Sequence, residues 1–243
     1  MPLNSISDWI QPQHLTSEAI AHYSGVMASN PEKIVVIDDF LFDRHIRNFQ
    51  ELMEKAGRKE LIYGLPGDPP RVSREKWLSV PEEKRFYTFL EVSGPNSGYE
   101  MSEAYLTHLL WRAFLKSQQF FDFIFEISGL KVNSVDCVNA KEFAKGHFLR
   151  EHCDTYPNRK IEFVLGFSSD WKREYGGQFL FFRNENSVWK QSADVEYKYN
   201  RMLMFVPMKG FFHAASPRTL EAEDVKRWNY TVFFSQIPGK SDS

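Results

Sequence analysis

The sequence predicts an α+β protein in which a helical N-terminal part, residues 1–128, packs on a mainly β core, residues 129–243. Before Gly129 the apolar residues recur at helical spacing, whereas after it they come in short runs divided by turn residues. Hydrophobic residues make up 42% of the chain, enough for a sizeable buried core. We therefore expect antiparallel sheets that form a sandwich or barrel, and one compact unit, since no flexible linker separates the two parts. The apolar runs of the core cover residues 132–143, 160–167, 178–182, 202–206 and 230–234.

The N-terminal part is expected to contain helices and one strand. Residues 17–28 have a modest helical pattern, and the β-branched run over 33–37 predicts the strand. Asp43 can cap a helix over residues 44–56, whose apolar side chains share one face. A long helix is predicted over residues 102–127, because a serine caps its start and Ser-Gly follows its end.

Residues 58–100 form the least regular part of the chain. Glycines and prolines mark a long loop near each end of this stretch, with a short helix expected over residues 81–90. Because long loops often carry specificity, we expect a lid here that brings Tyr63 and Arg74 to a substrate.

Charge and composition argue against several classes of protein. A net charge of −2 gives no electrostatic reason to expect nucleic acid binding. Two cysteines cannot build a disulfide framework, and residues 1–17 contain no apolar segment typical of an exported protein. No apolar run is long enough to span a membrane. We expect a cytoplasmic protein, and the oligomeric state is left open.

The segment His152-Cys153-Asp154 carries the first chemical signal. In an extended chain, residues two apart point to the same side, so the imidazole and the carboxylate project together. They are two-thirds of the 2-His-1-carboxylate triad that leaves iron(II) with open positions. His213, which follows an apolar strand, is the candidate for the third ligand. His147 competes for this role, but it lies five residues before His152 and would face the opposite side of a continuous strand.

A longer ordered pattern surrounds this segment over residues 139–236. It resembles the prolyl-4-hydroxylase-like branch of the 2-oxoglutarate/iron(II) oxygenases, and residues 33–53 resemble the strand and helix that usually precede that fold. The matching positions are Gly146, Phe148, Leu149, His152, Asp154, Arg159, Trp171, Gly176, Gly177, Asn200, Arg201, His213 and the eight residues 227–234.

The resemblance implies a double-stranded β-helix (jelly-roll) with N-terminal helices packed on one sheet. It implies iron(II) bound by His152, Asp154 and His213, with 2-oxoglutarate and O2 as co-substrates and ascorbate as a reductant. Arg227 would hold the distal carboxylate of 2-oxoglutarate, because a guanidinium can bind a carboxylate through two parallel hydrogen bonds. Thr231 lies on the same strand face and can donate its hydroxyl to that carboxylate.

Two departures from the family pattern bear on the co-substrate. Phe143 stands where members often have a tyrosine, so no hydroxyl is available there. The spacing between His213 and Arg227 is longer than is common, which leaves Arg218 and Lys226 as competitors for the carboxylate. Strand alternation points Lys226 away from the face that carries Arg227.

The predicted reaction is hydroxylation of an unactivated C–H bond, with release of succinate and CO2. The expected substrate is a small molecule, either an amino acid or a natural product, and the alternative is a peptidyl proline in a protein. Arg159 and Trp171 join Tyr63 and Arg74 as candidate substrate contacts, although Arg159 could instead order the loop after Asp154. Two other classes stay open, namely a non-catalytic cupin-like metal-binding barrel and a scaffold that binds a partner through its N-terminal helices.

Overall fold

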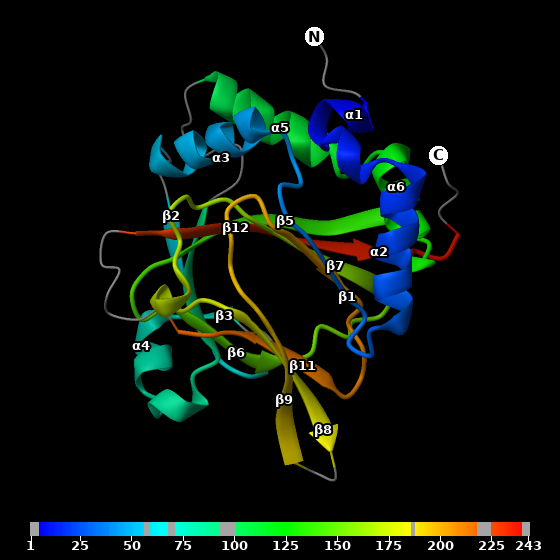
Figure 1. Ribbon diagram of the computed structural model, residues 1–243. Coiled ribbons are helices and arrows are strands. Elements are labelled where there is room, and N and C mark those ends of the chain that lie inside the picture. Colours follow the sequence, from blue (N-terminus) through cyan, green and yellow to red (C-terminus); the bar gives the residue numbers. More distant parts are fainter. Residues whose placement is uncertain are drawn as a thin grey trace.

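An antiparallel sheet curled into a barrel dominates the computed structural model, which describes residues 5–55, 59–67, 71–92, 101–185, 188–217 and 225–239. The hydrogen-bonded order is β1-β10-β7-β12-β5-β4-β6-β11-β8-β9, and β2 pairs with β3 and β4 (Figure 1). This arrangement is the double-stranded β-helix that the resemblance implies. One half of the barrel consists of β1 (Ile34–Ile37), β10 (Met202–Phe205), β7 (Arg159–Gly166), β12 (Arg227–Ser235) and β5 (Ser134–Phe143). The other consists of β6 (Phe148–His152), β11 (Phe211–Ala215), β8 (Phe179–Glu185) and β9 (Val188–Val195), with β2 (Lys59–Gly64), β3 (Arg71–Val72) and β4 (Tyr87–Val92) at the side.

Five helices, four of them longer than ten residues, gather on one side of the barrel, over the half that contains β5, β12 and β7 (Figure 1). Aromatic side chains fill the layer between them: Phe120 lies with its ring centroid 5.9 Å from that of Phe163 and 5.6 Å from that of Phe234. Trp111, fully buried, packs on the same layer. These helices are α1 (Ile6–Trp9), α2 (Ser17–Ser29), α3 (Asp43–Lys55), α5 (Glu103–Phe114) and α6 (Gln118–Ser128).

Strand alternation divides the side chains of β7 and β12 between the helical layer and the barrel interior. Tyr230 and Phe234 point to the helices, so Arg227, Asn229 and Thr231 point into the barrel. The apolar part of the interior comes from residues of the four strands β1, β7, β8 and β10: Ile34, Val164, Phe179, Phe181, Leu203 and Phe205.

The predicted single helix over residues 102–127 is wrong, because the chain breaks it into α5 and α6. Ser117 starts the second helix by accepting a hydrogen bond from the backbone N–H of Phe120, at 3.3 Å. The break lets Leu115 become fully buried against the sheet. Gly129 ends α6 with φ +70°, a conformation that glycine adopts without strain.

The predictions for residues 58–100 also need correction. The chain forms β2, β3, a short helix α4 (Arg74–Leu78) and β4, so the N-terminal part contributes four strands rather than one. Where a helix was expected over 81–90, a 3-10 turn (Glu82–Lys84) leads into β4, because pairing with β2, β5 and β6 outweighs local preference. Of the two predicted loops, residues 69–70 and 95–98 lie outside the described residues, while Gly64 ends β2 and a bend follows it at residues 66–67.

Besides Glu82–Lys84, the described residues contain two further 3-10 turns, Pro12–His14 and Arg173–Tyr175. The strands β8 and β9 form a hairpin that the sequence pattern did not predict. It lies at the end of the barrel away from α2, α5 and α6 (Figure 1). Within the described residues, no helix has the length and apolar character needed to cross a membrane.

Candidate metal centre

Polar side chains line a cavity of about 580 Å³ inside the barrel. The register of β12 against β5 places Arg227 opposite Phe143, Asn229 opposite Lys141 and Thr231 opposite Asn139. All six side chains line this cavity, together with His152, Asp154 and Glu162. Its volume lies within the range of about 300–1,000 Å³ that is typical of small-molecule sites.

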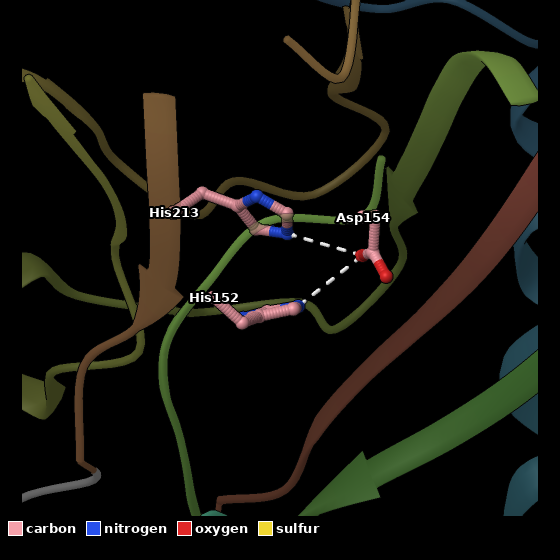
Figure 2. Close-up of side chains that lie close together, drawn as sticks. All are labelled: His152, Asp154 and His213. Carbon is pink, nitrogen blue, oxygen red and sulfur yellow. Dashed lines mark ion pairs between the residues drawn. The ribbon is translucent and has the colours of Figure 1, made fainter. Parts of the chain in front are cut away.

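His152, Asp154 and His213 lie close together (Figure 2), and His152 and Asp154 line this cavity. β6 and β11 pair so that His152 and His213 stand directly opposite each other, with ring centroids 4.1 Å apart. Asp154 follows His152 by two residues, and its Oδ2 lies 3.2 Å from Nε2 of His152 and 3.5 Å from Nε2 of His213. One atom from each residue lies within 4.8 Å of the other two. The three side chains can therefore bind one ion together.

Hydrogen bonds orient two of these three side chains. His152 donates from Nδ1 to the carbonyl oxygen of Arg150 at 2.8 Å, which leaves its Nε2 facing Asp154. Arg159 donates from Nη1 to Oδ1 of Asp154 at 3.0 Å, so Oδ2 is the atom turned toward the histidines. The loop after β6 is thus tied to the first residue of β7.

The electrostatics suit a cation. Burial alone would raise the pKa of Asp154, but the hydrogen bond from His152 and the charges of His152, His213 and Arg159 hold that pKa well below its usual value. Burial, followed by the charge of His152, lowers the pKa of His213 far below its usual value. An ionised carboxylate and a neutral imidazole are the forms that bind metals.

A buried nitrogen without a hydrogen-bond partner indicates that this site is suited to a metal ion. Nε2 of His213 is enclosed and has no hydrogen-bond partner among the described residues. A buried ring nitrogen in that condition costs free energy unless another group binds it. Because the donors are two imidazole nitrogens and one carboxylate oxygen, with space left beside them, they fit iron(II) and leave positions for further ligands.

Glu162 is a neighbour of this site that the sequence analysis missed. It is 3% exposed, and its Oε2 lies 3.5 Å from Nε2 of His213 and has no hydrogen-bond partner in the described part of the chain. Burial and the nearby charge of Asp154 raise its pKa well above the usual value. A signal was present, since Glu162 is the one acidic residue within the apolar run over 161–167.

Arg227 lies at another part of the cavity wall, fully enclosed. Its Nη1 donates to Oδ1 of Asn229 at 3.0 Å, and Nδ2 of Asn229 donates to Oγ1 of Thr231 at 3.1 Å. Nε and Nη2 of Arg227 have no hydrogen-bond partner among the described residues. Burial lowers its pKa to about 10, so the guanidinium stays protonated at neutral pH. Two unsatisfied N–H groups on one cation are suited to a carboxylate.

The competitors for the role of Arg227 do not share this position. Lys226 is exposed, as strand alternation predicts, and Arg218 lies outside the described residues. Phe143 supplies an aromatic face instead of a hydroxyl, with its ring centroid 4.9 Å from the guanidinium carbon. His147, the competitor for the metal, accepts a hydrogen bond from the N–H of Ala144 at 3.1 Å and is not part of the cluster.

The predicted substrate contacts separate into two groups. Arg159 lines the cavity and also pairs with Asp154. Tyr63, Arg74 and Trp171 are not among the described residues that line it. Tyr63 packs on the indole of Trp77 at 5.2 Å, Arg74 begins α4, and the indole N–H of Trp171 donates to the carbonyl of Gly176 at 3.2 Å. A role of these three in substrate binding stays a prediction.

Comparisons with known proteins agree with this geometry. The family model described as oxoglutarate and iron-dependent oxygenase degradation C-term matches residues 2–199. The match includes His152 and Asp154, whereas His213 and Arg227 lie beyond it. No curated protein matches the sequence.

Solved structures show similarity in fold at low sequence identity. A prolyl hydroxylase from Trichoplax adhaerens, in complex with a hypoxia inducible factor oxygen degradation domain peptide, is 12% identical with a TM-score of 0.59, over 91% of this chain and 94% of that one. A prolyl-4-hydroxylase from Pseudomonas putida is 16% identical with a TM-score of 0.58, over 90% and 99%. An oxidoreductase of the 2OG-Fe(II) oxygenase family from Burkholderia pseudomallei is 10% identical with a TM-score of 0.61, over 93% and 95%.

Proposed function

Because this chain belongs to the family of oxoglutarate- and iron-dependent oxygenases, we propose that His152, Asp154 and His213 hold its iron(II) and that Arg227 holds its 2-oxoglutarate. The observation that carries this proposal is the pair of unsatisfied positions in one interior. Nε2 of His213 lacks a partner at the cluster, and Nε and Nη2 of Arg227 lack partners at the enclosed cation. The free imidazole nitrogen of His213 can bind a metal cation, and the free N–H groups of Arg227 can bind a carboxylate. Iron(II) and 2-oxoglutarate, which the family uses, are such a cation and such a carboxylate.

The residues of the chain prepare the site for these cofactors. The carbonyl of Arg150 fixes which nitrogen His152 presents, and Arg159 holds the carboxylate of Asp154 in place. Asn229 orients the guanidinium of Arg227 from the same strand, and Thr231 continues this row of hydrogen bonds. When bound, iron(II) with 2-oxoglutarate and O2 supplies the oxidising power for hydroxylation of a C–H bond, with succinate and CO2 as by-products.

Apolar side chains limit the access of water to the site. The rings of Phe205 and Phe181 lie 4.9 Å and 6.2 Å from that of His213, within the apolar part of the barrel interior. In such surroundings, the charges of the metal ligands and of Arg227 act with little screening by solvent.

We test the assignment by binding and by turnover. Mn²⁺ and N-oxalylglycine, an inert analogue of 2-oxoglutarate, should bind to the purified protein in a calorimetric titration. With iron(II) and ascorbate, the protein should convert 2-oxoglutarate to succinate. His213→Ala should lose Mn²⁺ binding and turnover, because it removes an enclosed ligand. His147→Ala, at the histidine outside the cluster, should keep both. Mn²⁺ binding that survives in His213→Ala would contradict the assignment.

For the substrate, we propose a small molecule such as an amino acid or a natural product. The second candidate is a peptidyl proline, because two of the structurally similar proteins are prolyl hydroxylases and one of these was solved with a peptide. Mass spectrometry of the products from a panel of amino acids and proline-rich peptides separates the two. A gain of one oxygen atom in a peptide alone would overturn the small-molecule proposal.

A further inference from the structure

Lys141, on β5, is a buried cation in the cavity that the proposed function does not use. It is 8% exposed and lines the same cavity as His152 and Asp154. Its ammonium lies 4.9 Å from the ring centroid of Phe89, and neither a hydrogen bond nor an ion pair reaches it from the described residues. A buried lysine that has only an aromatic ring as its partner is unusual.

The other basic residues of the cavity each have a partner or a role. Arg71 pairs with Glu91 at 2.6 Å, and Arg159 pairs with Asp154 at 3.0 Å. Arg227 is the cation proposed for 2-oxoglutarate. Lys141 is therefore the one basic residue lining the described cavity whose charge neither a carboxylate within ion-pair distance nor the proposed co-substrate accounts for.

Glu162, a carboxyl group that lines the same cavity, does not neutralise Lys141 directly. Glu162 acts on it through space, but the two side chains form no ion pair within 4.0 Å. The free Oε2 of Glu162 is enclosed beside His213, where it faces the position proposed for the metal. Lys141, by contrast, lines the open part of the same cavity, where its ammonium faces the ring of Phe89.

The two cations stand at different levels of the barrel. Arg227 lies opposite Phe143, whereas Lys141 lies opposite Asn229, two residues farther along β12. Under the proposed function, 2-oxoglutarate uses one carboxylate at Arg227 and the other at the metal. A carboxylate at Lys141 must then come from a second molecule. The volume of about 580 Å³ is compatible with two small ligands.

We propose that Lys141 binds a carboxylate of the primary substrate, which makes the substrate a small organic acid such as an amino acid with a free carboxylate. This inference rests on the proposed function of the site. It excludes neutral molecules and the interior residues of a peptide, since neither brings a carboxylate to the ammonium. Burying the ammonium against a carboxylate lets each charge satisfy the other.

The test compares L-amino acids with their carboxamides, which keep the shape and lose the negative charge. Each is titrated into protein loaded with Mn²⁺ and N-oxalylglycine. At least one acid should bind ten-fold or more tightly than its amide, as expected for a charge-assisted hydrogen bond. Lys141→Met should abolish this preference and bind N-oxalylglycine within two-fold of the wild type. Lys141→Arg, which keeps the charge, should retain the preference.

Lys59→Met is the matched control. Lys59 is similarly shielded from solvent but pairs with Glu142 at 2.5 Å, away from the residues that line the cavity. This variant should keep the preference for acids. Failure of every acid to bind, equal binding of acid and amide, or a preference that survives in Lys141→Met would each overturn the inference. Loss of N-oxalylglycine binding in Lys141→Met would also overturn it, by assigning Lys141 to the co-substrate. Failure of the proposed function is seen separately, as wild-type protein that binds neither Mn²⁺ nor N-oxalylglycine.

Discussion

Replacing Arg227 by methionine should separate binding of 2-oxoglutarate from stability of the fold. The side chain is 1% exposed, and two of its nitrogens have no hydrogen-bond partner among the residues that the structure describes. Each hydrogen bond to a charged group contributes about 1.5–3 kcal/mol, so two of them contribute about 3–6 kcal/mol to binding. Since about 1.4 kcal/mol corresponds to a ten-fold change, the Kd for 2-oxoglutarate should rise about 10²- to 10⁴-fold. Arg227→Lys keeps the positive charge but loses the paired N–H groups of the guanidinium, so its Kd should lie between those of the wild type and Arg227→Met.

Stability should respond much less to the same substitution. Methionine removes a buried cation that lacks a counter-ion, which offsets the lost contacts with the rings of Phe143 and Tyr197 and the lost hydrogen bond to Asn229. The free energy of unfolding without ligand should stay within about 2 kcal/mol of the wild type. If Arg227 served the fold instead, Arg227→Met would lower the free energy of unfolding strongly and leave the Kd for 2-oxoglutarate nearly unchanged.

The assay is a calorimetric titration of 2-oxoglutarate into Mn²⁺-loaded protein without oxygen, with urea unfolding of the metal-free protein in parallel. Arg112→Met is the control, because Arg112 is half-buried, donates to the carbonyl of Val138 at 2.7 Å and does not line the cavity. It should leave the Kd unchanged. A Kd within ten-fold of the wild type in Arg227→Met, or a loss of stability above about 4 kcal/mol, would refute the reasoning.

Three further outcomes are expected. Glu162→Gln should weaken Mn²⁺ binding about ten-fold, because a bound cation beside Glu162 favours the ionised carboxylate that burial otherwise disfavours, and glutamine cannot ionise. Glu151→Gln, at the exposed edge of the cavity, should leave the affinity unchanged, and equal affinities of the two variants in a titration would contradict this prediction. Gly177→Ala should weaken 2-oxoglutarate binding and lower the melting temperature, because its Cβ would lie 2.7 Å from Cδ of Arg227 at a φ of +73°; unchanged binding would count against this contact. Burial lowers the pKa of His108 from 6.5 to about 4, so the unfolded state binds the extra proton between these values. Stability should be complete above pH 6.5 and fall by up to about 3 kcal/mol as the pH drops toward 4, and urea titrations of His108→Gln should lack that slope.

Local patterns in the sequence were sufficient for the parts of the site that lie on one strand. Alternation along an extended chain placed His152 and Asp154 on one side and turned Lys226 away from Arg227, and the structure has both features. The same rule placed Thr231 with Arg227. These predictions needed only the period of a strand, which neighbouring residues determine by themselves.

Other parts depended on which strands become neighbours. His213 reaches His152 because β11 pairs with β6 in one register, and a shift by one residue would point its ring to the other face. Glu162 stands out as the one acidic residue of its apolar run, but its position beside Lys141 in one cavity follows only from the pairing of β7, β12 and β5. The strand β4 looked helical until its partners were known.

The sequence by itself thus determined the periodicities, the chemical types at the site and the family to which they point. Closure of the barrel decided which of those groups share one interior and which polar atoms are left without partners. The physical reason is that pairing between distant strands depends on the burial of both faces at once, a property that no single segment contains.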